Sequence, residues 1–373
     1  MKVVAAIDSF KGSMTSMEAG NAVKKGILAA KPDAEVWLSP LADGGEGTVD
    51  ALIEGLGAEK IPVTVAGPLG EKVSCYYGFL EETKTAVMEM ASAAGITLVI
   101  KKDPLRASTY GVGEMIADAL KRGCKNFIIG IGGSATNDGG IGMLKALGFE
   151  FFDEDGNDVG EGAAALAKIE VIQTENKNPL LSGAKFQIAC DVKNPLCGKQ
   201  GATYIFGPQK GVTEEQKSKV DEAMKHYADV TKESLGCDFA DCEGAGAAGG
   251  LGYAFLSYLA GELIPGVELI LQATGLEEKM KNADVVVTGE GRLDAQTVMG
   301  KAPVGVAALA KKYNAKVIAF AGSVAPEASV CNQAGIDAFF PIVRGVTTLE
   351  EAMKKENAME NIAATAEQVF RLL

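Results

Sequence analysis

The sequence has a single histidine, a single tryptophan and no long apolar run. A histidine-based triad or a histidine-rich metal site would have to use His226. Around it, Val220, Met224 and Tyr227 form the apolar stripe of an expected helix, and His226 falls toward the polar flank. No stretch approaches the roughly 20 apolar residues that a bilayer-spanning helix needs. We therefore expect neither histidine chemistry nor a membrane partner.

Paired cysteines and clustered positive charge are also missing. None of the seven cysteines falls in a C-x-x-C pair, and the closest pairs have no histidine neighbour to complete a zinc site. The N-terminal MKVVAAID lacks the apolar core and cleavage site of a signal peptide, so we expect reduced thiols in a cytoplasmic protein. The net charge is −13 and no lysine-rich stripe is visible. A nucleic-acid partner is therefore not expected, because many phosphates would have to be neutralised.

Short β-branched runs alternate with amphipathic stretches, which is typical of an α/β chain with largely parallel sheets. Thr15 with Glu18, and Thr347 with Glu350, form capping boxes that predict two helix starts. Further helices are expected over 303–312 and 326–334. The apolar runs predict buried strands over residues 3–8, 35–40, 284–291, 316–322 and 338–343. The two ends of the chain thus supply the strands of one sheet.

The middle of the chain has a different pattern. The stretch IPVTVAGPLGEKVSCYYGFLEETKTAVMEM alternates apolar and polar residues around turns, which predicts antiparallel strands. We therefore expect an α/β protein of two domains. One is a Rossmann- or flavodoxin-like parallel-sheet domain built from residues 1–66 and 277–373, and the other is an inserted mixed α/β domain over residues 67–276. The active site is expected in the cleft between them.

Glycine occurs together with acidic, amide or hydroxyl residues at the ends of the expected strands. Glycine lets backbone N–H groups approach an anion, and a helix that follows adds its positive end. One such loop is more often a tight turn than a site, but several with the same placement favour phosphate binding. The stretches are DSFKGS (8–13), LADGGEGT (41–48), GIGGSATNDGG (130–140), CDVKNPLCG (190–198), GAGAAGGLG (244–252) and GEGRLDAQT (289–297).

One of these loops also fits a different function. GIGGSA matches the G-x-G-x-x-A fingerprint of dinucleotide-binding folds, and Glu150 follows about 20 residues later. This supports the hypothesis of an NAD(P)-dependent hydroxyacid reductase. Asp138 weakens it, because a negative charge beside a pyrophosphate is unfavourable unless a metal ion intervenes. The loop is better suited to a phosphate together with a cation.

Phosphoryl transfer explains why carboxylates and glycines occur together. Mg²⁺ neutralises the transferring group and prefers one or two carboxylates, and the acceptor hydroxyl needs a base. Each acid alone could equally cap a helix or a turn, so only the combination indicates phosphoryl transfer. Neither a P-loop nor a protein-kinase motif is present. The acids are Asp8, Asp43, Glu46, Asp138, Asp191, Glu290 and Asp294, and the cations are Lys11, Lys193, Arg292 and Lys301.

Taken together, the motifs closely resemble those of the bacterial glycerate kinases whose product is usually 2-phosphoglycerate. The resemblance runs from residue 1 to the last helix and implies a two-domain α/β enzyme that uses ATP and Mg²⁺ to phosphorylate D-glycerate. The motifs follow the same order: DSFKGS, PLADGGEGT, STYGVGE (108–114), GIGGSATNDGG, CDVKNPLCG with GPQKG (207–211), GAAGGLG and TGEGRLDAQTVMGKAP.

The chemistry of phosphoryl transfer, applied to these motifs, gives each residue an expected role. Asp191 is the candidate general base or metal ligand, with Asp294 as a further metal ligand. Lys11 and Arg292 are expected to contact the substrate carboxylate or the transferring phosphoryl group. Substrate binding is assigned to Asp8, Ser9, Asp43, Glu46, Asn194 and Glu290. Nucleotide or phosphate binding is assigned to Gly132, Gly133, Ser134, Thr136, Asn137, Asp138, Gly249 and Gly250.

Several alternatives stay open at this point. The product is either 2-phosphoglycerate or 3-phosphoglycerate, because the two attacks differ by a small rotation of the substrate. The protein is either a monomer or a homodimer. From other functional classes, the alternatives are the hydroxyacid reductase and a non-catalytic metabolite-binding protein.

Overall fold

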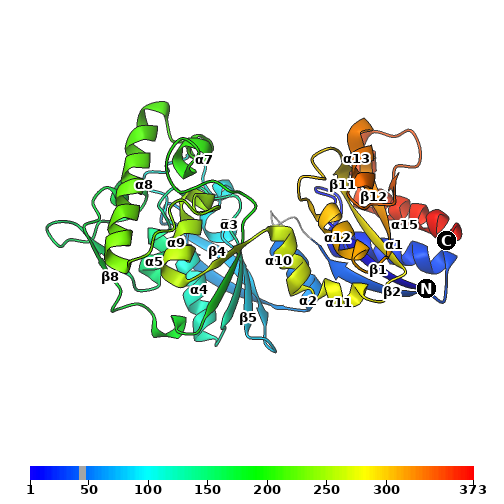
Figure 1. The fold of residues 1–373 in the computed structure, drawn as a ribbon, viewed down its shortest axis with the longest axis horizontal. Coiled ribbons are helices and arrows are strands. Elements are labelled where there is room, and N and C mark those ends of the chain that lie inside the picture. Colours follow the sequence, from blue (N-terminus) through cyan, green and yellow to red (C-terminus); the bar gives the residue numbers. More distant parts are fainter. Residues whose placement is uncertain (42–47) are drawn as a thin grey trace. The chain divides into compact units, whose positions relative to one another are not determined.

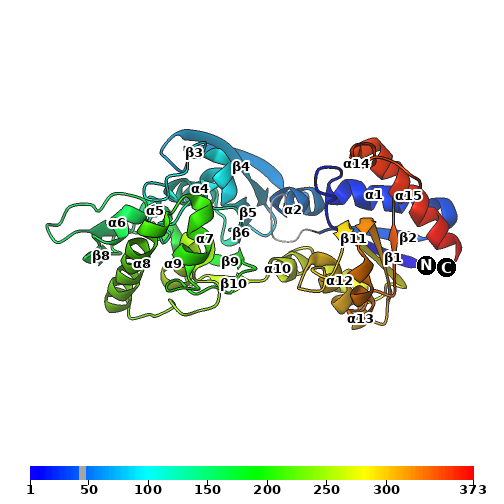
Figure 2. The same ribbon diagram turned by 90° about the horizontal axis from the view of Figure 1, so that it is seen from above.

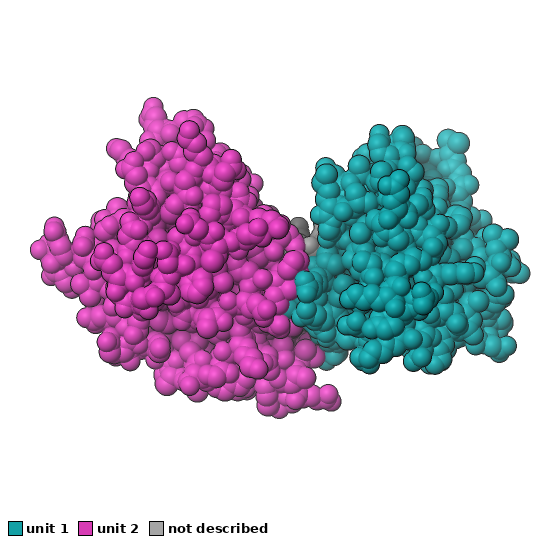
Figure 3. Space-filling view, viewed as in Figure 1, with its two compact units in different colours: residues 1–43, 50–57, 267–373 teal, residues 44–49, 58–266 magenta. Residues whose placement is uncertain are grey.

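The chain folds as two units, each with its own sheet and its own hydrophobic core (Figure 3). The computed structural model describes residues 1–41 and 48–373. Unit 1 combines Met1–Asp43, Asp50–Gly57 and Val267–Leu373. Unit 2 combines Gly44–Val49 and Ala58–Gly266.

Unit 1 is built on a five-stranded parallel sheet in the order β13-β12-β11-β1-β2 (Figure 1). In the centre of this sheet, Val3 pairs with Val285 on one side and with Val36 on the other. Both faces of the central strands are buried, which explains their nearly continuous apolar sequence. The strands are β1 (Lys2–Ile7), β2 (Glu35–Pro40), β11 (Val285–Leu293), β12 (Lys316–Val324) and β13 (Ala338–Pro341).

Helices cover both faces of this sheet. Figure 2 shows α1 and α15 together on one face and α12 with α13 on the other. A Cβ atom at Gly26 of α1 would lie 2.0 Å from the carbonyl oxygen of Ala363 in α15, so only glycine permits this close crossing. The helices of unit 1 are α1 (Ser16–Ala30), α2 (Thr48–Leu56), α10 (Gly266–Ala273), α11 (Leu276–Met280), α12 (Ala302–Lys311), α13 (Val330–Gln333), α14 (Leu349–Met353) and α15 (Lys355–Arg371).

The strand order of unit 1 reverses between two neighbouring strands, β1 and β11. The chain leaves β1 through α1 toward β2 on one side, and it leaves β11 through α12 toward β12 on the other. Ligands of open parallel sheets bind at such a point, because the diverging connections leave a crevice at the carboxyl ends of the strands. The turns that follow β1 and β11 are therefore the expected ligand-binding edge of unit 1.

Unit 2 contains a six-stranded mixed sheet in the order β10-β9-β6-β5-β4-β3. The first three strands in sequence, β3 (Glu59–Ala66), β4 (Lys72–Leu80) and β5 (Thr85–Glu89), pair in antiparallel fashion. From β5 onward, β6 (Asn126–Gly130), β9 (Lys185–Ala189) and β10 (Glu262–Ile264) pair in parallel. A separate hairpin joins β7 (Glu150–Phe152) to β8 (Val171–Gln173).

The helices of unit 2 pack around this sheet and bring its glycine-rich loops together. The loops over residues 131–140 and 190–201 follow the carboxyl ends of β6 and β9, and the loop over 244–250 precedes α9. The helices are α3 (Ala91–Ala94), α4 (Tyr110–Lys121), α5 (Ile141–Ala146), α6 (Ala163–Leu166), α7 (Ala202–Lys210), α8 (Glu214–Leu235) and α9 (Leu251–Leu259).

The predicted α/β fold class is confirmed, with a parallel sheet from both chain ends and a mixed sheet from the middle. The capping box of Thr15 and Glu18 is confirmed as well. The predicted start of the last helix is wrong by one residue. Thr348, not Thr347, caps α14 by accepting a hydrogen bond from the backbone of Glu351. The capping pattern, a threonine followed three residues later by a glutamate, is met both by Thr347 with Glu350 and by Thr348 with Glu351.

Three further details differ from the sequence-based expectation. The tail forms two helices, α14 and α15, separated at Lys354, and residues 326–334 form a short 3₁₀ turn (Pro326–Ser329) followed by α13. Residues 59–66 form β3 in the sheet of unit 2, although the boundary drawn from the sequence placed them in the discontinuous domain. In the described part of the chain, no helix has the length and apolarity that a bilayer crossing requires.

Candidate active site

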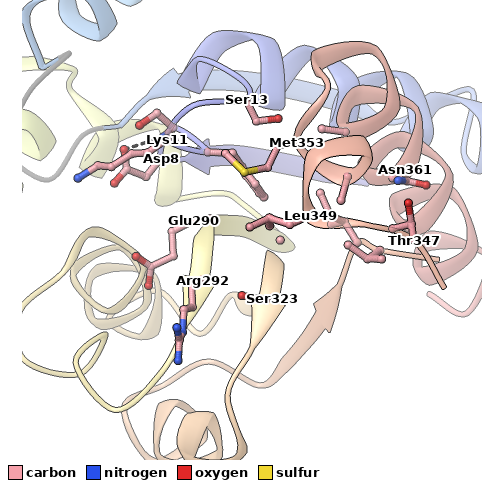
Figure 4. A pocket seen from close by; sticks show the side chains of 18 of the residues that line it. Asp8, Lys11, Ser13, Glu290, Arg292, Ser323, Thr347, Leu349, Met353 and Asn361 are labelled. Atoms are coloured by element: carbon pink, nitrogen blue, oxygen red, sulfur yellow. Dashed lines mark hydrogen bonds between the residues drawn. The ribbon is translucent and has the colours of Figure 1, made fainter. Parts of the chain in front are cut away.

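A cavity of about 670 Å³ opens at the ligand-binding edge of unit 1 (Figure 4). The turn after β1, the carboxyl ends of β11 and β12 and the turn after β11 form one part of its wall, and the chain from Ile342 to Asn361, which includes α14, forms the other. The cavity therefore lies where the sheet topology predicts a ligand. Charged side chains gather at the strand ends, and mainly apolar side chains come from the later segment.

The turn after β1 brings Asp8 and Lys11 to the cavity wall. The backbone N–H of Asp8 donates to the carbonyl oxygen of Gly289, at 2.9 Å, which ties the end of β1 to β11. The buried Asp8 carboxylate accepts a hydrogen bond of 2.6 Å from the backbone N–H of Ser9. Nearby, Ser13 also lines the cavity, and its buried hydroxyl has no hydrogen-bond partner among the described residues.

The end of β11 places a second set of charged side chains on the same wall. Glu290 is 8% exposed, and one of its carboxylate oxygens accepts a hydrogen bond of 2.6 Å from the Thr297 hydroxyl. Its other oxygen lies 3.8 Å from the Lys301 ammonium. Arg292 is exposed, with its Nε 3.5 Å from Asp294 Oδ2. Asp294 in turn accepts from the backbone N–H of Gln296 at 2.9 Å. This wall is thus ordered by local contacts before any ligand binds.

The other end of the cavity is mostly apolar. Ile342 and Ala358 are buried beneath it, whereas Leu349 is 76% exposed and Met353 is 37% exposed. Figure 4 shows Lys11 and Asp8 at one end of the cavity, Thr347 and Asn361 at the other, and Leu349 with Met353 between them. The cavity is therefore elongated, with charged groups at one end and, toward the other, an apolar surface bordered by Thr347 and Asn361; we call this second part the apolar end.

In unit 2, the predicted phosphate loop over residues 130–140 is mostly buried. The Asp138 carboxylate is fully buried and accepts hydrogen bonds from the backbone and hydroxyl of Thr109, both at 2.8 Å, and from the backbone N–H groups of Gly140 and Gly142. Burial raises the pKa of the Asp138 carboxyl, against these hydrogen bonds. Its contacts hold the loop onto the start of α4.

The neighbouring polar side chains of this loop also face the interior. The Asn137 amide donates to the Thr203 hydroxyl at 3.0 Å, and the hydroxyls of Ser134 and Thr136 lie 2.8 Å apart. Of the predicted phosphate-binding residues in this loop, Gly132 and Gly133 are the exposed ones. Their backbone is the part of the loop that a ligand can reach.

The second glycine-rich loop of unit 2 packs directly on the first. A Cβ atom at Gly249 would lie 2.1 Å from the carbonyl oxygen of Thr136, and the φ angle of Gly249 is +71°. A Cβ atom at Gly250 would lie 2.7 Å from the Cα atom of Gly139. This close packing is sufficient to explain glycine at both positions, whether or not a phosphate binds there.

A buried lysine that the sequence did not indicate lies beneath these loops. Lys210 lies in the GPQKG stretch, is fully buried, and donates from Nζ to the carbonyl oxygen of Thr136 at 2.6 Å. Burial lowers its pKa to about 7, while the nearby Asp138 charge acts in the opposite direction. No sequence signal distinguishes it from a surface lysine, because its burial results from the packing of α7 against distant loops.

The remaining predicted residues of unit 2 lie in the loop after β9. Asp191 is exposed, and one of its oxygens accepts a hydrogen bond of 2.8 Å from the backbone N–H of Gly266, the last residue of unit 2. The Asn194 amide donates to the carbonyl oxygen of Gln200 at 2.7 Å. Two predicted substrate-binding residues, Asp43 and Glu46, lie outside the described residues.

The structure therefore gathers one subset of the predicted residues around a single cavity in unit 1: Asp8, Ser9, Lys11, Glu290, Arg292 and Asp294. The predicted residues of unit 2 do not line this cavity. Five further residues of this site were not among the candidates predicted from the sequence: Ser13, Thr297, Leu349, Met353 and Asn361. In the described ranges, no three acidic, histidine or cysteine side chains are arranged to hold a metal ion by themselves.

Comparison with known proteins identifies the family. The family described as "Glycerate kinase family" matches residues 3–373, nearly the whole chain. The chain belongs to the glycerate kinase family. The chain is similar to a glycerate kinase from Bacillus subtilis. The two sequences are 45% identical over 371 residues, and the match covers 99% of this chain and 97% of the relative. A glycerate 2-kinase from Escherichia coli is 45% identical over 372 residues, covering 98% of both chains.

The fold of the glycerate kinase family is also known from a crystal structure. A protein from Salmonella typhimurium LT2, described there as a candidate glycerate kinase 2, superposes with a TM-score of 0.92. It is 43% identical, and the match covers 99% of this chain and 97% of the other. The two-unit architecture described above is thus shared with a solved structure.

Membership of the glycerate kinase family makes the chain an ATP-dependent phosphotransferase with an alcohol acceptor. The hypothesis of a hydroxyacid reductase is therefore wrong, and so is that of a non-catalytic binding protein. The structure gives a physical reason for the first correction. Asp138 and its neighbours are packed inside unit 2, and Glu150 lies on a separate hairpin, where its carboxylate binds the Asn176 amide at 2.8 Å.

Proposed function

We propose that the protein transfers the γ-phosphoryl group of ATP to the 2-hydroxyl of D-glycerate, giving 2-phosphoglycerate. Membership of the glycerate kinase family supports the reaction, and the E. coli relative named glycerate 2-kinase supports the position. The observation that carries the proposal is the cavity of unit 1, in which cations and carboxylates from two strand ends face one space.

The cations of this cavity are suited to a transferring phosphoryl group. Lys11, Arg292 and Lys301 line it together, and the transition state of phosphoryl transfer spreads negative charge over the equatorial oxygens. Arginine offers a planar fork of donors that matches phosphate oxygens, and lysine offers a point charge. We assign Arg292 and Lys11 to the phosphoryl group or to the glycerate carboxylate, since both ligands are anions of similar size.

The carboxylates have a complementary task at the same wall. Glu290 is held by the Thr297 hydroxyl and lies near Lys301, so its orientation is fixed before the substrate binds. An oriented carboxylate of this kind binds a substrate hydroxyl or accepts its proton, and general-base assistance is worth roughly 10²–10⁴-fold. We assign Glu290 and Asp8 to the hydroxyl groups of glycerate. Asp191, in unit 2, remains the sequence-based candidate for a base or a metal ligand.

The donor set of the cavity fits a magnesium ion. Mg²⁺ is commonly held by one or two carboxylates, with substrate phosphates and water completing its octahedron, and Asp8 and Asp294 supply carboxylates to the wall. Of these, Asp294 would hold the ion, and Asp8 would bind the hydroxyl groups of glycerate. When bound, Mg²⁺ neutralises charge on the phosphates of ATP.

A phosphorus NMR experiment tests this proposal. Purified protein is mixed with ATP, D-glycerate and MgCl₂, and the ³¹P spectrum is recorded with proton coupling. We expect ADP and one phosphomonoester whose phosphorus couples to a single carbon-bound proton, as attachment at carbon 2 requires. A matched sample with excess EDTA should form neither product.

Two results would contradict the proposal in different ways. A phosphomonoester coupled to two protons would show attachment at carbon 3 and would refute the assigned position. ATP left unchanged in the magnesium sample would refute the reaction itself.

A further inference from the structure

We propose that the apolar end of the unit 1 cavity binds the purine base of ATP. The nucleotide then lies along this cavity, with its phosphates at the strand ends. This inference rests on the proposed kinase function and deepens it, because the family assignment does not say which residues recognise the nucleotide. It also moves the nucleotide away from the glycine-rich loops of unit 2.

The size of the cavity argues for a nucleotide. Its volume is about 670 Å³, within the roughly 300–1,000 Å³ of pockets that bind drug-sized ligands. A three-carbon acid would occupy only a small part of this space. ATP is the one substrate of the reaction that is large enough to reach from the charged end to the apolar end.

The apolar end exposes side chains of a kind that is usually buried away from water. Leu349 and Met353 are one helical turn apart in α14, and both side chains are substantially exposed at the cavity wall, above buried Ile342 and Ala358. Exposed apolar side chains that gather at a cavity commonly mark a ligand surface. A flat heteroaromatic ring gains free energy by covering such side chains, since apolar area is removed from water on both partners.

Polar groups at this end suit the edge of an adenine ring. Asn361 of α15 and Thr347 line the cavity at its apolar end (Figure 4). An asparagine amide carries both a donor and an acceptor, and it matches the adjacent amino donor and ring-nitrogen acceptor of adenine. Asn361 is therefore the residue that we assign to base selection.

The order of groups along the cavity follows the order of groups in ATP. The apolar end lies beside Asn361, and the cations Lys11 and Arg292 lie at the strand ends (Figure 4). Ser13 also lines the cavity, and its hydroxyl is buried with no hydrogen-bond partner in the described part of the chain. Buried hydroxyls are normally satisfied, so a polar atom of the ligand is a suitable partner for Ser13.

The test uses Leu349→Asp in the full-length protein and compares steady-state kinetics for both substrates. A charge on the surface that covers the base should raise the KM for ATP by about tenfold or more, because burial of a leucine-sized apolar contact is lost and a carboxylate is desolvated. The KM for D-glycerate should change by less than about twofold. The control is Ile100→Asp, which introduces the same change at a completely exposed residue of unit 2 and should leave both constants unchanged.

A second variant tests base recognition. Asn361→Ala should lower the preference for ATP over inosine triphosphate, which lacks the amino group, by about tenfold in kcat/KM. Gln368→Ala, on an exposed position of the same helix, should keep the wild-type preference. Loss of helix stability alone would affect both nucleotides equally, so the ratio separates recognition from folding.

The outcomes distinguish this inference from the proposed function. A rise in the KM for D-glycerate without one for ATP would place the acceptor at the apolar end and overturn the inference, as would unchanged constants in Leu349→Asp. A wild-type protein without kinase activity would refute the proposed function instead. Calorimetric titration with ATP would then still test the inference, with tenfold weaker binding expected for Leu349→Asp and equal binding overturning it.

Discussion

Arg292→Ala is expected to lower kcat for glycerate phosphorylation by at least about 10²-fold. The guanidinium lines the charged end of the cavity, and removal of one donor that contacts transition-state charge typically costs roughly 10²–10³-fold in kcat. Folding should be almost unaffected. The side chain is exposed, its neighbour Asp294 lies 3.5 Å away, and exposed ion pairs contribute only about 0–1 kcal/mol to the free energy of unfolding.

Two matched variants sharpen this result. Arg292→Lys keeps the charge but loses the planar fork of donors, so its kcat should lie between those of the wild type and Arg292→Ala. Arg106→Ala removes an exposed arginine of unit 2 and should leave kcat unchanged. The account of the charged end is wrong if Arg292→Ala keeps a near wild-type kcat while its thermal midpoint is also unchanged.

Glu290→Gln is expected to lower kcat by about 10²-fold or more while the protein stays folded. Glutamine has the shape of glutamate and can still accept the hydrogen bond of the Thr297 hydroxyl, but it has no negative charge and cannot accept a proton. The loss expected for a group that assists a reacting hydroxyl is roughly 10²–10⁴-fold. Stopped-flow or coupled measurement of ADP release, with circular dichroism as a check of the fold, provides the comparison.

Glu18→Gln is the control for the second prediction. Glu18 belongs to the same unit and pairs with Lys355 and the backbone of Thr15, away from the cavity. Glutamine keeps the capping box, so the loss of the ion pair with Lys355 should lower the free energy of unfolding by about 1 kcal/mol or less, with kcat unchanged. Equal kcat values for Glu290→Gln and Glu18→Gln would show that the Glu290 charge has no part in the reaction.

Much of the fold was predictable from local sequence patterns. The strands of unit 1 are buried on both faces and therefore read as continuous apolar runs, and the capping box of Thr15 and Glu18 fixes the start of α1. The last helices were harder, because adjacent threonines at 347 and 348 permit two capping registers. The boundary of the inserted domain was also imprecise, because the sequence of β3 does not indicate which of the two sheets the strand joins.

The candidate site was predictable in part, for a physical reason. Asp8 directly follows β1 and Glu290 lies near the carboxyl end of β11, and the ends of parallel strands meet at one edge of a sheet. The sequence does not tell a glycine that binds phosphate from one that permits close packing, as at Gly249. Nor does it reveal that Asp138 is buried or that Leu349 is exposed, because burial is decided by contacts between segments distant in the chain.

Photoaffinity labelling tests the central claim, that the nucleotide occupies the cavity of unit 1, most directly. The protein is irradiated with 8-azido-ATP and Mg²⁺, with and without excess ATP, and the tryptic peptides are mapped by mass spectrometry. We predict ATP-protected labelling of the peptide over residues 345–354, which carries Leu349 and Met353, or of the following peptide that carries Asn361. Protected labelling confined to residues 130–140 or 244–252 would contradict the account and place the nucleotide on the glycine-rich loops of unit 2.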